Sequence, residues 1–254
     1  MNGPALTLGL MGALAAAGAH ARDGSRAARQ PSPDTALVLP ETIQGLPAVV
    51  LVDAARLSRV ASEDQLLGMR SCVLGFIRLS YPMDHQERIT SRCETPRTGL
   101  GPLQVWNSAA EKGWGPLTYD AALWVARDLE PSSDSLNGYL IPDRNVVYSG
   151  ACRIWTYYAE HRKSDVSSRR LSPDCPRHGL GVLEEDPVLD RMYRLKRRSL
   201  TARRIDALHT RGWRLLTDLE EAELPLQDGS GFMDREELEQ AFLKLGEALF
   251  EEHF

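Results

Sequence analysis

The chain has 254 residues, of which 43% are hydrophobic and 26% charged, the balance expected of a protein with a packed core. Its 30 Lys and Arg residues against 35 Asp and Glu residues give a net charge of −5, which argues against a general nucleic-acid footprint. The four cysteines include no CxxC pair, which excludes the common zinc signatures and makes a reducing compartment the simplest setting.

The N-terminal region is apolar and then polar. Residues 5–21, ALTLGLMGALAAAGAHA, end in an A-x-A-like site as a secretory signal does, but they lack a basic n-region and contain glycines. We expect a poorly ordered leader followed by a flexible connector at residues 22–34. The expected location is the cytoplasm, with secretion as the alternative if residues 1–21 act as a signal peptide, and no membrane span is expected.

From residue 35 onward, strand and helix patterns predict an α/β fold. TALVLP and LPAVVLVD are short β-branched runs bounded by prolines, and residues 54–67 fit one or two helical turns. Residues 71–81, SCVLGFIRLSY, form a continuous apolar run that ends at Pro82, as expected of a central strand buried on both faces. Residues 83–99 are charged and lack periodicity, so they are predicted to be a loop.

A glycine turn separates the next strand from the next helix. Residues 102–108 are a strand candidate, and Thr118 can cap a helix that starts after the turn and ends near Asp128. Residues 138–142 give another short strand, and Ser149 opens a helix that runs to about His161.

The remainder of the chain changes character. Residues from 162 onward are punctuated by Pro and Gly, and helical patterns follow at about 200–211 and 234–250. The expected organisation is a leader and connector at 1–34, an α/β domain at 35–166, an extended connector at 167–199 and a C-terminal helical pair at 200–254.

Two blocks of opposite charge occupy the C-terminal part. Residues 191–214 contain nine Lys or Arg and one acid, a net charge of +8, and residues 218–254 contain twelve acids and two basic residues, a net charge of −10. We expect the blocks to attract each other as faces of an antiparallel helix pair. The alternative, contact of the basic block with nucleic acid, is disfavoured because no aromatic residues are interleaved for stacking.

The turn Ala110-Glu-Lys-Gly-Trp-Gly115 has the composition of an anion site. A helix N-terminus leaves backbone N–H groups free and carries partial positive charge, and Gly113 and Gly115 let an anionic group approach closely. Pro116 removes one possible donor, and proline is also a common first residue of a helix. From the residues alone, a phosphate cradle and a plain strand-to-helix corner both remain open.

The order of the elements, the pairing of VLGFIRLS with LQVWNSAAEKGWG and the following YLIPDRNVVYSGACRIWTYY resemble the second half of a GNAT-type N-acyltransferase. Three ordered segments resemble more closely a group of uncharacterised GNAT-like proteins encoded by tailed bacteriophages. They are GWGPLTYD at 113–120, LIPDRNVVYS at 140–149 and IWTYY…RKSDV at 154–166, about a third of the chain. In the GNAT family, a Q/R-x-x-G-x-G/A turn holds the pyrophosphate of acetyl-coenzyme A. Here both glycines match and Ala110 replaces the Gln or Arg. The resemblance implies a GNAT-like mixed sheet flanked by helices, with the C-terminal helices as an extension.

The resemblance also implies a site and an activity. The family is an acetyl-coenzyme A-dependent acyltransferase family that acts on small-molecule or protein amines, and Tyr158 matches the tyrosine that lies near the thioester sulfur and acts as an acid. A core aromatic is the alternative for Tyr158. The residues implied for acetyl-coenzyme A are Glu111, Lys112, Gly113, Trp114, Gly115 and Leu117.

A second hypothesis is a non-enzymatic protein. Pro116, Ala110 and the lack of an obvious base favour a degenerate relative, such as a phage accessory or virion-associated protein that binds a protein partner. A cleft between the strands that flank Gly113 distinguishes the two hypotheses, because the pantetheine arm of coenzyme A needs one.

Asp143 and Arg144 follow Pro142 at a strand end, where ligands collect in open α/β sheets. They are predicted to bind substrate, with a salt bridge that orders the loop as the alternative.

Residues 228–237 resemble most of an EF-hand calcium loop, with Asp228, Ser230, Asp234 and Glu237 at ligand positions. Leu226 stands where the first carboxylate is needed, so we predict a helix-capping turn and no metal site. Together with the leader, this segment makes an exported calcium-binding module a third hypothesis.

Overall fold

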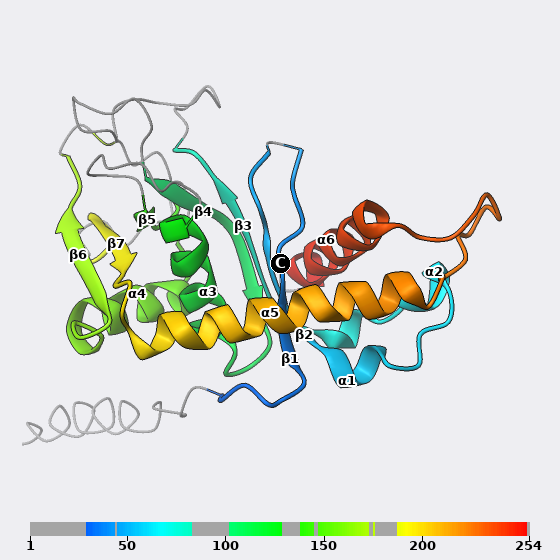
Figure 1. Ribbon diagram of the computed structural model, residues 1–254. Coiled ribbons are helices and arrows are strands. Elements are labelled where there is room, and N and C mark those ends of the chain that lie inside the picture. Colours follow the sequence, from blue (N-terminus) through cyan, green and yellow to red (C-terminus); the bar gives the residue numbers. More distant parts are fainter. Residues whose placement is uncertain are drawn as a thin grey trace, which may run out of the picture.

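The computed structural model describes residues 29–43, 45–82, 102–128, 138–144, 147–172, 175 and 187–252. These residues form a seven-stranded sheet with helices on both faces (Figure 1), which confirms the predicted α/β class. The leader at residues 5–21 and the loop predicted at 83–99 lie outside the described residues. None of the helices in the described ranges is both long enough and apolar enough to cross a membrane.

The sheet has the strand order β1-β2-β3-β4-β5-β7-β6. Every neighbouring pair is antiparallel except β4 and β5, which are parallel. The strands are β1 (Thr35–Val38), β2 (Val49–Asp53), β3 (Val73–Ser80), β4 (Leu103–Ala110), β5 (Leu140–Ile141), β6 (Val166–Arg170) and β7 (Arg191–Leu195). The helices are α1 (Ala54–Leu57), α2 (Glu63–Leu67), the 3-10 turn η1 (Arg70–Cys72), α3 (Gly115–Asp128), α4 (Ser149–His161), α5 (Leu200–Glu221) and α6 (Arg235–Glu252).

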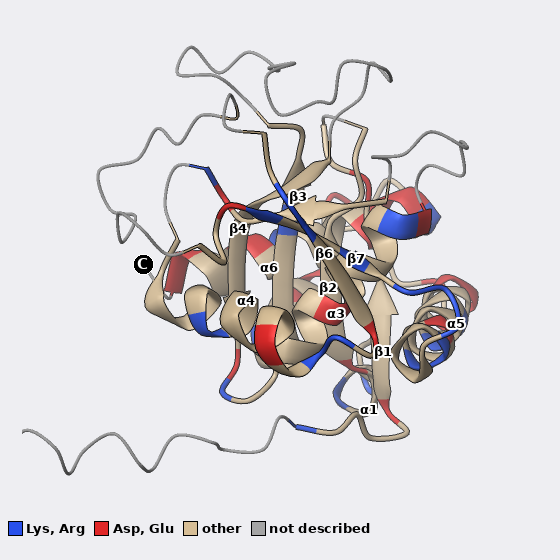
Figure 2. Cartoon of the chain, turned by 90° about the vertical axis from the view of Figure 1, so that its left-hand side faces the viewer, with Lys and Arg blue, Asp and Glu red and all other residues tan. Residues whose placement is uncertain are grey.

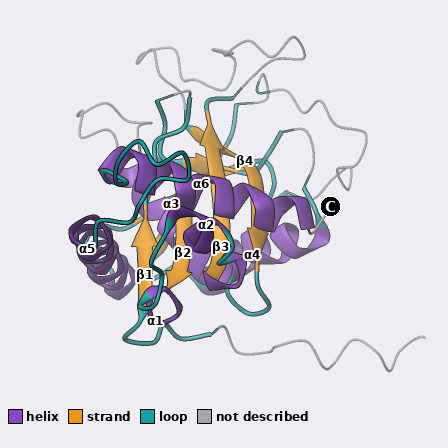
Figure 3. Ribbon diagram, turned by 90° about the vertical axis from the view of Figure 1, so that its right-hand side faces the viewer, coloured by secondary structure: helices purple, strands orange, loops and turns teal. Residues whose placement is uncertain are grey.

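The sheet separates two apolar layers. Side chains alternate between the two faces of a strand, so the neighbours Val50 and Leu51 on β2 belong to different layers. Leu51 lies in the layer covered by α3, α4 and the first half of α5. Val50 lies in the layer formed with α1, α2, the second half of α5 and α6, and Figure 3 shows α6 lying across that face. Burial on both faces explains the continuous apolar run predicted to be a central strand, which is β3.

Helix α5 runs past the edge strand β1 at very close range (Figure 1). A Cβ atom at Gly212 would lie 1.8 Å from the carbonyl oxygen of Leu37, so only glycine permits this approach. The helix thereby covers an exposed sheet edge.

The organisation of the second half differs from the sequence prediction. Strands β6 and β7 lie inside the range 167–199 or at its border, which was expected to be an extended connector, and they complete the sheet. Strand β6 is the edge strand, and its polar sequence suits that position, whereas β7 lies between β5 and β6 and buries three of its five residues. Helices α5 and α6 pack on the sheet as well as on each other, so the sheet domain and the helical pair share one core.

The opposite charge blocks do not pair as expected; Figure 2 marks the basic and acidic residues along the ribbon. Glu252 and Glu247 of α6 form ion pairs with Arg70 and Arg78, which lie outside the basic block. Among the described residues, no ion pair joins the basic block 191–214 to the acidic residues 218–252. Apolar packing on the sheet therefore places α5 and α6.

The cysteines are in two states. Cys72 and Cys152 are free, and burial raises the pKa of the Cys72 thiol to about 12. Cys175 is disulfide-bonded. Disulfides persist in oxidising compartments, so this bond departs from the reducing compartment that was the simplest expectation.

Candidate functional site

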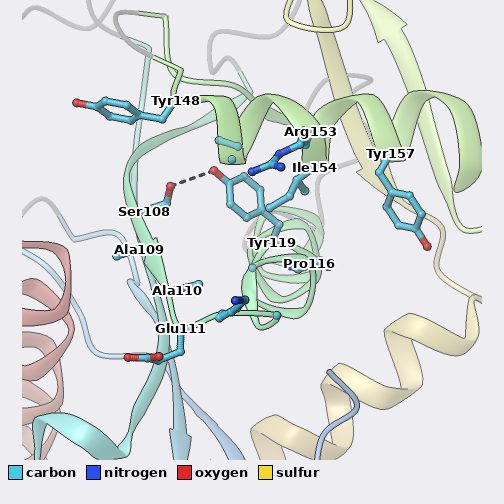
Figure 4. Close-up of a pocket in the computed structure, with 15 residues that line it drawn as sticks. Ser108, Ala109, Ala110, Glu111, Pro116, Tyr119, Tyr148, Arg153, Ile154 and Tyr157 are labelled. Atoms are coloured by element: carbon cyan, nitrogen blue, oxygen red, sulfur yellow. Dashed lines mark hydrogen bonds between the residues drawn. The ribbon is translucent and has the colours of Figure 1, made fainter. Parts of the chain in front are cut away.

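A cavity of about 600 Å³ lies between the end of β4, the first turn of α3 and α4 (Figure 4). Residues 108–113 form the β4 wall and the turn, and Gly115, Pro116 and Tyr119 form the α3 wall. The α4 side carries Tyr148, Gly150, Ala151, Arg153, Ile154 and Tyr157. The glycine turn that the sequence singled out is therefore part of a cavity wall.

Hydrogen bonds hold the turn in one shape. Glu111 N–H donates to the carbonyl of Leu74 at 3.0 Å, and Trp114 N–H donates to the carbonyl of Glu111 at 2.9 Å. Gly113 adopts φ +92°, a left-handed conformation that favours glycine. Its carbonyl accepts from the N–H of Arg29 at 3.0 Å, so the segment before β1 lies against the turn.

The turn leaves backbone donors without protein partners. Helix α3 begins with the bond from Thr118 N–H to the carbonyl of Trp114, so Thr118 lies within the helix and is not its predicted cap. In the described parts of the chain, the N–H groups of four residues have no acceptor: Lys112, Gly113, Gly115 and Leu117. These donors, together with the positive end of the α3 dipole, make the end of the cavity suited to an anion.

Two basic residues line the cavity, and a third lies against the turn. Lys112 and Arg153 line it from the turn and from α4. The Arg29 side chain lies over the turn, with Cγ 2.9 Å from the point where a Cβ on Gly113 would be. Among the residues that the structure describes, Glu111 is the one carboxylate in this lining, so the local charge favours a ligand with several negative charges.

A smaller cavity of about 230 Å³ adjoins the first. The two share Ser108, Tyr119, Tyr148 and Ala151, and the smaller one continues along β4 to Val105 and reaches Asp143 and Phe250. Together they form a cleft that runs from the turn back along β4.

The short length of β5, whose two residues both pair with β4, leaves room for this cleft. The strands pair only at Leu103 with Leu140 and at Gln104 with Ile141. On its other side, β4 shifts register against β3 near Trp106, which gives β4 an extra residue there. Beyond Gln104, the cleft-facing edge of β4 has no strand partner within the described residues.

Tyr119 and Ser108 meet where the two cavities join. Their hydroxyl oxygens lie 3.0 Å apart, as the dashed line in Figure 4 marks. Burial raises the pKa of Tyr119 to about 12, so this hydroxyl stays protonated at neutral pH and can donate a hydrogen bond or a proton.

Tyr158, the acid implied by the resemblance, lies in the core. Its hydroxyl donates to Asp120 Oδ1 at 2.9 Å, it does not belong to either cavity lining, and burial raises its pKa well above the ordinary value. Asp120 forms a salt bridge with Arg162 at 3.4 Å, although burial raises the pKa of this carboxyl. Arg162 also binds Asp165 at 3.0 Å. The structure therefore gives Tyr158 the role of a buried network member, which was the alternative from the sequence.

Two of the residues implied for acetyl-coenzyme A also have side chains in the core. Trp114 and Leu117 are buried in the core layer under α3, so they can contribute backbone but not side chains to the cavity. The indole Nε1 of Trp114 is buried without a partner.

Asp143 and Arg144 are adjacent but act in different places. Asp143 lines the smaller cavity and accepts from Gln104 Nε2 at 3.2 Å. Arg144 is buried and donates to the carbonyl of Leu189 at 2.7 Å, with a salt bridge to Asp190 at 3.3 Å. Arg144 thus ties the segment after β5 to the turn before β7, and only Asp143 faces a cavity.

The EF-hand-like segment is a helix cap, as predicted. Asp234 accepts from the N–H of Glu237 at 2.9 Å, and Glu237 accepts from the N–H of Asp234 at 2.8 Å, which is a reciprocal capping box. Asp228 accepts from the N–H of Ser230. Across the described ranges, no group of three or more His, Cys, Asp or Glu could hold a metal ion.

Sequence reasoning missed several residues of the cavity and one that lies against the turn. Arg29 lies in a segment read as a flexible connector, and no pattern there predicts contact with the turn. Ser108, Tyr119 and Arg153 lie on elements that were predicted, and a helical wheel of α4 places Arg153 beside Tyr157 on the face opposite Trp155. This placement of Arg153 and Tyr157 opposite the apolar face of α4 is the sequence feature that could have predicted them as cavity residues.

No family model, curated protein or solved structure matches this chain. Its candidate site is therefore defined by its own geometry.

Proposed function

We propose that this protein binds an acyl-coenzyme A and transfers the acyl group to an amine, as an N-acyltransferase of the GNAT type. The observation that carries the proposal is the continuity of one cleft. It begins at the free N–H groups of the glycine turn and continues along the unpaired edge of β4.

The turn suits the pyrophosphate of the ligand. Gly113 and Gly115 remove side-chain atoms from the approach, and the neighbouring N–H groups can donate to phosphate oxygens. Lys112 and Arg153 add positive charge to the cavity lining, and Arg29 lies against Gly113 of the turn. This combination compensates for Ala110, which stands where the family pattern has Gln or Arg.

The edge of β4 suits the pantetheine arm. An extended strand presents N–H and C=O groups along its free edge, and an arm that contains amides can pair with them as an added strand would. Beyond Gln104 no described strand occupies that edge. The extra residue of β4 at Trp106 lies in the wall of the smaller cavity, two residues before Ser108, where the two cavities join.

The chemistry needs an acid for the leaving sulfur. Acetyl-coenzyme A supplies a thioester, whose acyl carbon bonds to the nitrogen of a neutral amine as the C–S bond breaks. We infer that Tyr119, which is protonated and hydrogen-bonded to Ser108, donates its proton to the departing sulfur. The amine nitrogen loses one proton to solvent in the same reaction, and Tyr119 regains a proton from solvent. The proposal therefore assigns to Tyr119 the acid role that the resemblance suggests for Tyr158.

The second candidate is a non-enzymatic protein that binds a partner through the same cleft. The bond from Arg29 N–H to the carbonyl of Gly113 favours it, because the chain itself already occupies one side of the turn. On this reading, the cleft binds a protein segment and not a nucleotide.

Calorimetric titration with acetyl-coenzyme A tests the proposal, with a Gly115→Glu variant beside the wild type. A Cβ at Gly115 would lie 3.1 Å from the Cδ1 of Ile154, so the new carboxylate enters the cavity, while an acid in the first turn of a helix is tolerated. Gly231→Glu is the matched control, because a Cβ there meets nothing within 4 Å.

The proposal predicts that wild type and Gly231→Glu bind equally and that Gly115→Glu loses affinity by about tenfold or more, a change of about 1.4 kcal/mol. A folded wild-type protein that does not bind, or a Gly115→Glu variant that binds as tightly as wild type, would overturn it. The first of these results would favour the partner-binding candidate.

A further inference from the structure

The smaller cavity begins at the Ser108–Tyr119 pair and continues away from the glycine turn. Ser108, Tyr119, Tyr148 and Ala151 belong to both linings, so the two cavities meet at these residues. In Figure 4 the turn at Glu111 lies below the Ser108–Tyr119 pair, and Tyr148 lies above it. The proposed function places the thioester at this junction, because Tyr119 is the acid assigned to its sulfur.

The acyl group and the pantetheine arm lie on opposite sides of the thioester sulfur. Since the arm reaches the junction through the larger cavity, the acyl group extends into the smaller one. Tyr148 lines both cavities and is 54% exposed, so the junction is open to solvent. The amine can therefore reach the acyl carbon from the solvent side without passing through the smaller cavity.

The lining of the smaller cavity suits an uncharged acyl chain. Its apolar members are Val105, Trp106, Val147, Ala151, Trp155 and Phe250. Among the described residues that line it there is no Lys, Arg or His, and the one charged side chain is that of Asp143. Apolar atoms gain free energy by leaving water for such a lining. A carboxylate on the acyl group would be repelled by the carboxylate of Asp143 and would meet no cation.

The smaller cavity is also larger than an acetyl group needs. A water molecule takes up about 30 Å³ in the liquid, and the methyl of an acetyl group is of similar size. The volume of the smaller cavity is about 230 Å³. An acetyl group would leave most of the apolar lining without contacts, whereas a longer chain would supply them.

We propose that the preferred donor is a coenzyme A thioester of a medium-length, uncharged acyl group, whose chain lies in the smaller cavity. This inference rests on the proposed function for the reaction and for the position of the thioester. The bonds that form and break are those of the proposed transfer, because the chain lies beyond the reacting acyl carbon.

Calorimetric titration with a series of thioesters tests the inference. The probes are acetyl-, hexanoyl- and succinyl-coenzyme A, with free coenzyme A beside them. We expect hexanoyl-coenzyme A to bind about tenfold more tightly than acetyl-coenzyme A or better, because its longer chain leaves water. Succinyl-coenzyme A is expected to bind no more tightly than the acetyl form. Equal binding of the hexanoyl and acetyl forms, or preference for the succinyl form, overturns the inference.

A matched pair of variants locates the chain. Val147 lines the smaller cavity alone, and Val60 lies outside both cavities; both side chains are partly buried. Val147→Trp is expected to weaken hexanoyl-coenzyme A about tenfold and to leave free coenzyme A unchanged, whereas Val60→Trp is expected to bind both as wild type does. If the two folded variants bind hexanoyl-coenzyme A equally well, the chain lies elsewhere and the inference is wrong.

A variant that enlarges the cavity gives an independent test. Phe250 lines the smaller cavity and not the larger one. Phe250→Ala is expected to shift the preference from hexanoyl- toward octanoyl-coenzyme A, since it makes room for a longer chain. An unchanged preference in the folded variant would contradict the position of the chain.

Free coenzyme A separates this inference from the proposed function, because it carries the phosphates and the arm without an acyl group. Binding of free coenzyme A with no gain from the hexanoyl group contradicts the acyl subsite alone. Failure of free coenzyme A and of every thioester to bind a folded protein contradicts the proposed function, and the inference with it.

Discussion

Helices α3 and α4 present adjacent residues to two opposite environments. Tyr119 and Tyr157 line the cavity, whereas their chain neighbours Asp120 and Tyr158 are buried in a network with Arg162. Asp120, Tyr158 and Arg162 form the Asp120 network, in which each side chain has a hydrogen bond or an ion pair. At the turn, by contrast, four backbone donors have no described acceptor.

The Asp120 network contributes to the stability of the fold, whereas the unpaired donors of the turn are available to bind a ligand. Buried polar groups that are fully paired hold α3, α4 and the start of α5 together, because breaking one pair leaves another group unsatisfied. Polar groups left unpaired beside a cavity cost stability and gain a partner only when a ligand arrives. We expect substitutions in the Asp120 network to affect folding, and substitutions in the cleft to affect binding and turnover.

The largest expected effect is that of Arg162→Met. Removing the guanidinium leaves the Asp120 carboxylate buried without its counter-charge, which should lower the free energy of unfolding by about 3–5 kcal/mol at pH 8. Denaturant unfolding followed by circular dichroism measures this loss. A loss below about 1 kcal/mol would show that the network does not hold the helices together.

The same variant has an expected pH dependence. Burial raises the pKa of Asp120 in the folded protein, and without Arg162 that pKa should rise further. A raised folded-state pKa contributes stability that is present at low pH and lost as the pH rises through that pKa. The deficit of Arg162→Met relative to wild type should therefore be smaller at pH 5 than at pH 8, and a larger deficit at pH 5 would contradict this account.

A matched pair of substitutions compares the two environments directly. Tyr158→Phe removes a donor to buried Asp120 and is expected to destabilise the fold by about 1–3 kcal/mol with little change in acetyl-coenzyme A affinity. Tyr119→Phe is expected to cost about 1 kcal/mol or less in stability and to slow acyl transfer by about 100-fold. Unfolding curves and thiol release measure both, and the opposite pattern would return the acid role to Tyr158.

A smaller effect is expected from the cations beside the turn. Lys112→Ala and Arg153→Ala should each weaken acetyl-coenzyme A binding by about threefold to tenfold at low salt, and the loss should shrink as salt rises. Arg170→Ala and Lys244→Ala are controls, since both residues are exposed and lie outside the cavity linings. Equal losses in the controls would point to a general charge effect.

The smallest effect concerns calcium. The carboxylates of Asp234 and Glu237 already accept backbone N–H groups in the cap of α6. Millimolar calcium is therefore expected to leave the thermal transition unchanged. A rise of several degrees would show that the segment 228–237 is a metal site after all.

The sequence predicted the elements of the site better than its side chains. Strand β4, the glycine turn, α3 and α4 were all placed correctly to within a few residues, because apolar periodicity and glycines mark them. The sequence could not show that Tyr119 faces the cavity and Tyr158 the core. Consecutive helical residues point about 100° apart, and only the packing partners of α3 and α4 decide which of them is buried. Thr118 was expected to cap α3, but the helix starts three residues earlier at Gly115.

Long-range contacts account for the remaining differences. The bond from Arg29 to Gly113 joins segments far apart in the chain, and nothing in a short, polar stretch before β1 predicts it. Strand β6 was missed because it is a short, polar edge strand. Strand β7 lies inside the sheet, but its five residues, RMYRL, are too few to show apolar periodicity.

The most direct test of the account is the response of individual backbone amides to coenzyme A. In ¹H–¹⁵N spectra, we expect the amides of Lys112, Gly113 and Gly115 to shift on titration, while those of Asp120 and Tyr158 stay unchanged. That result would place the phosphates at the free donors of the turn. Unchanged turn amides in a folded protein, or shifts confined to other regions, would contradict the central claim that this turn binds an anion.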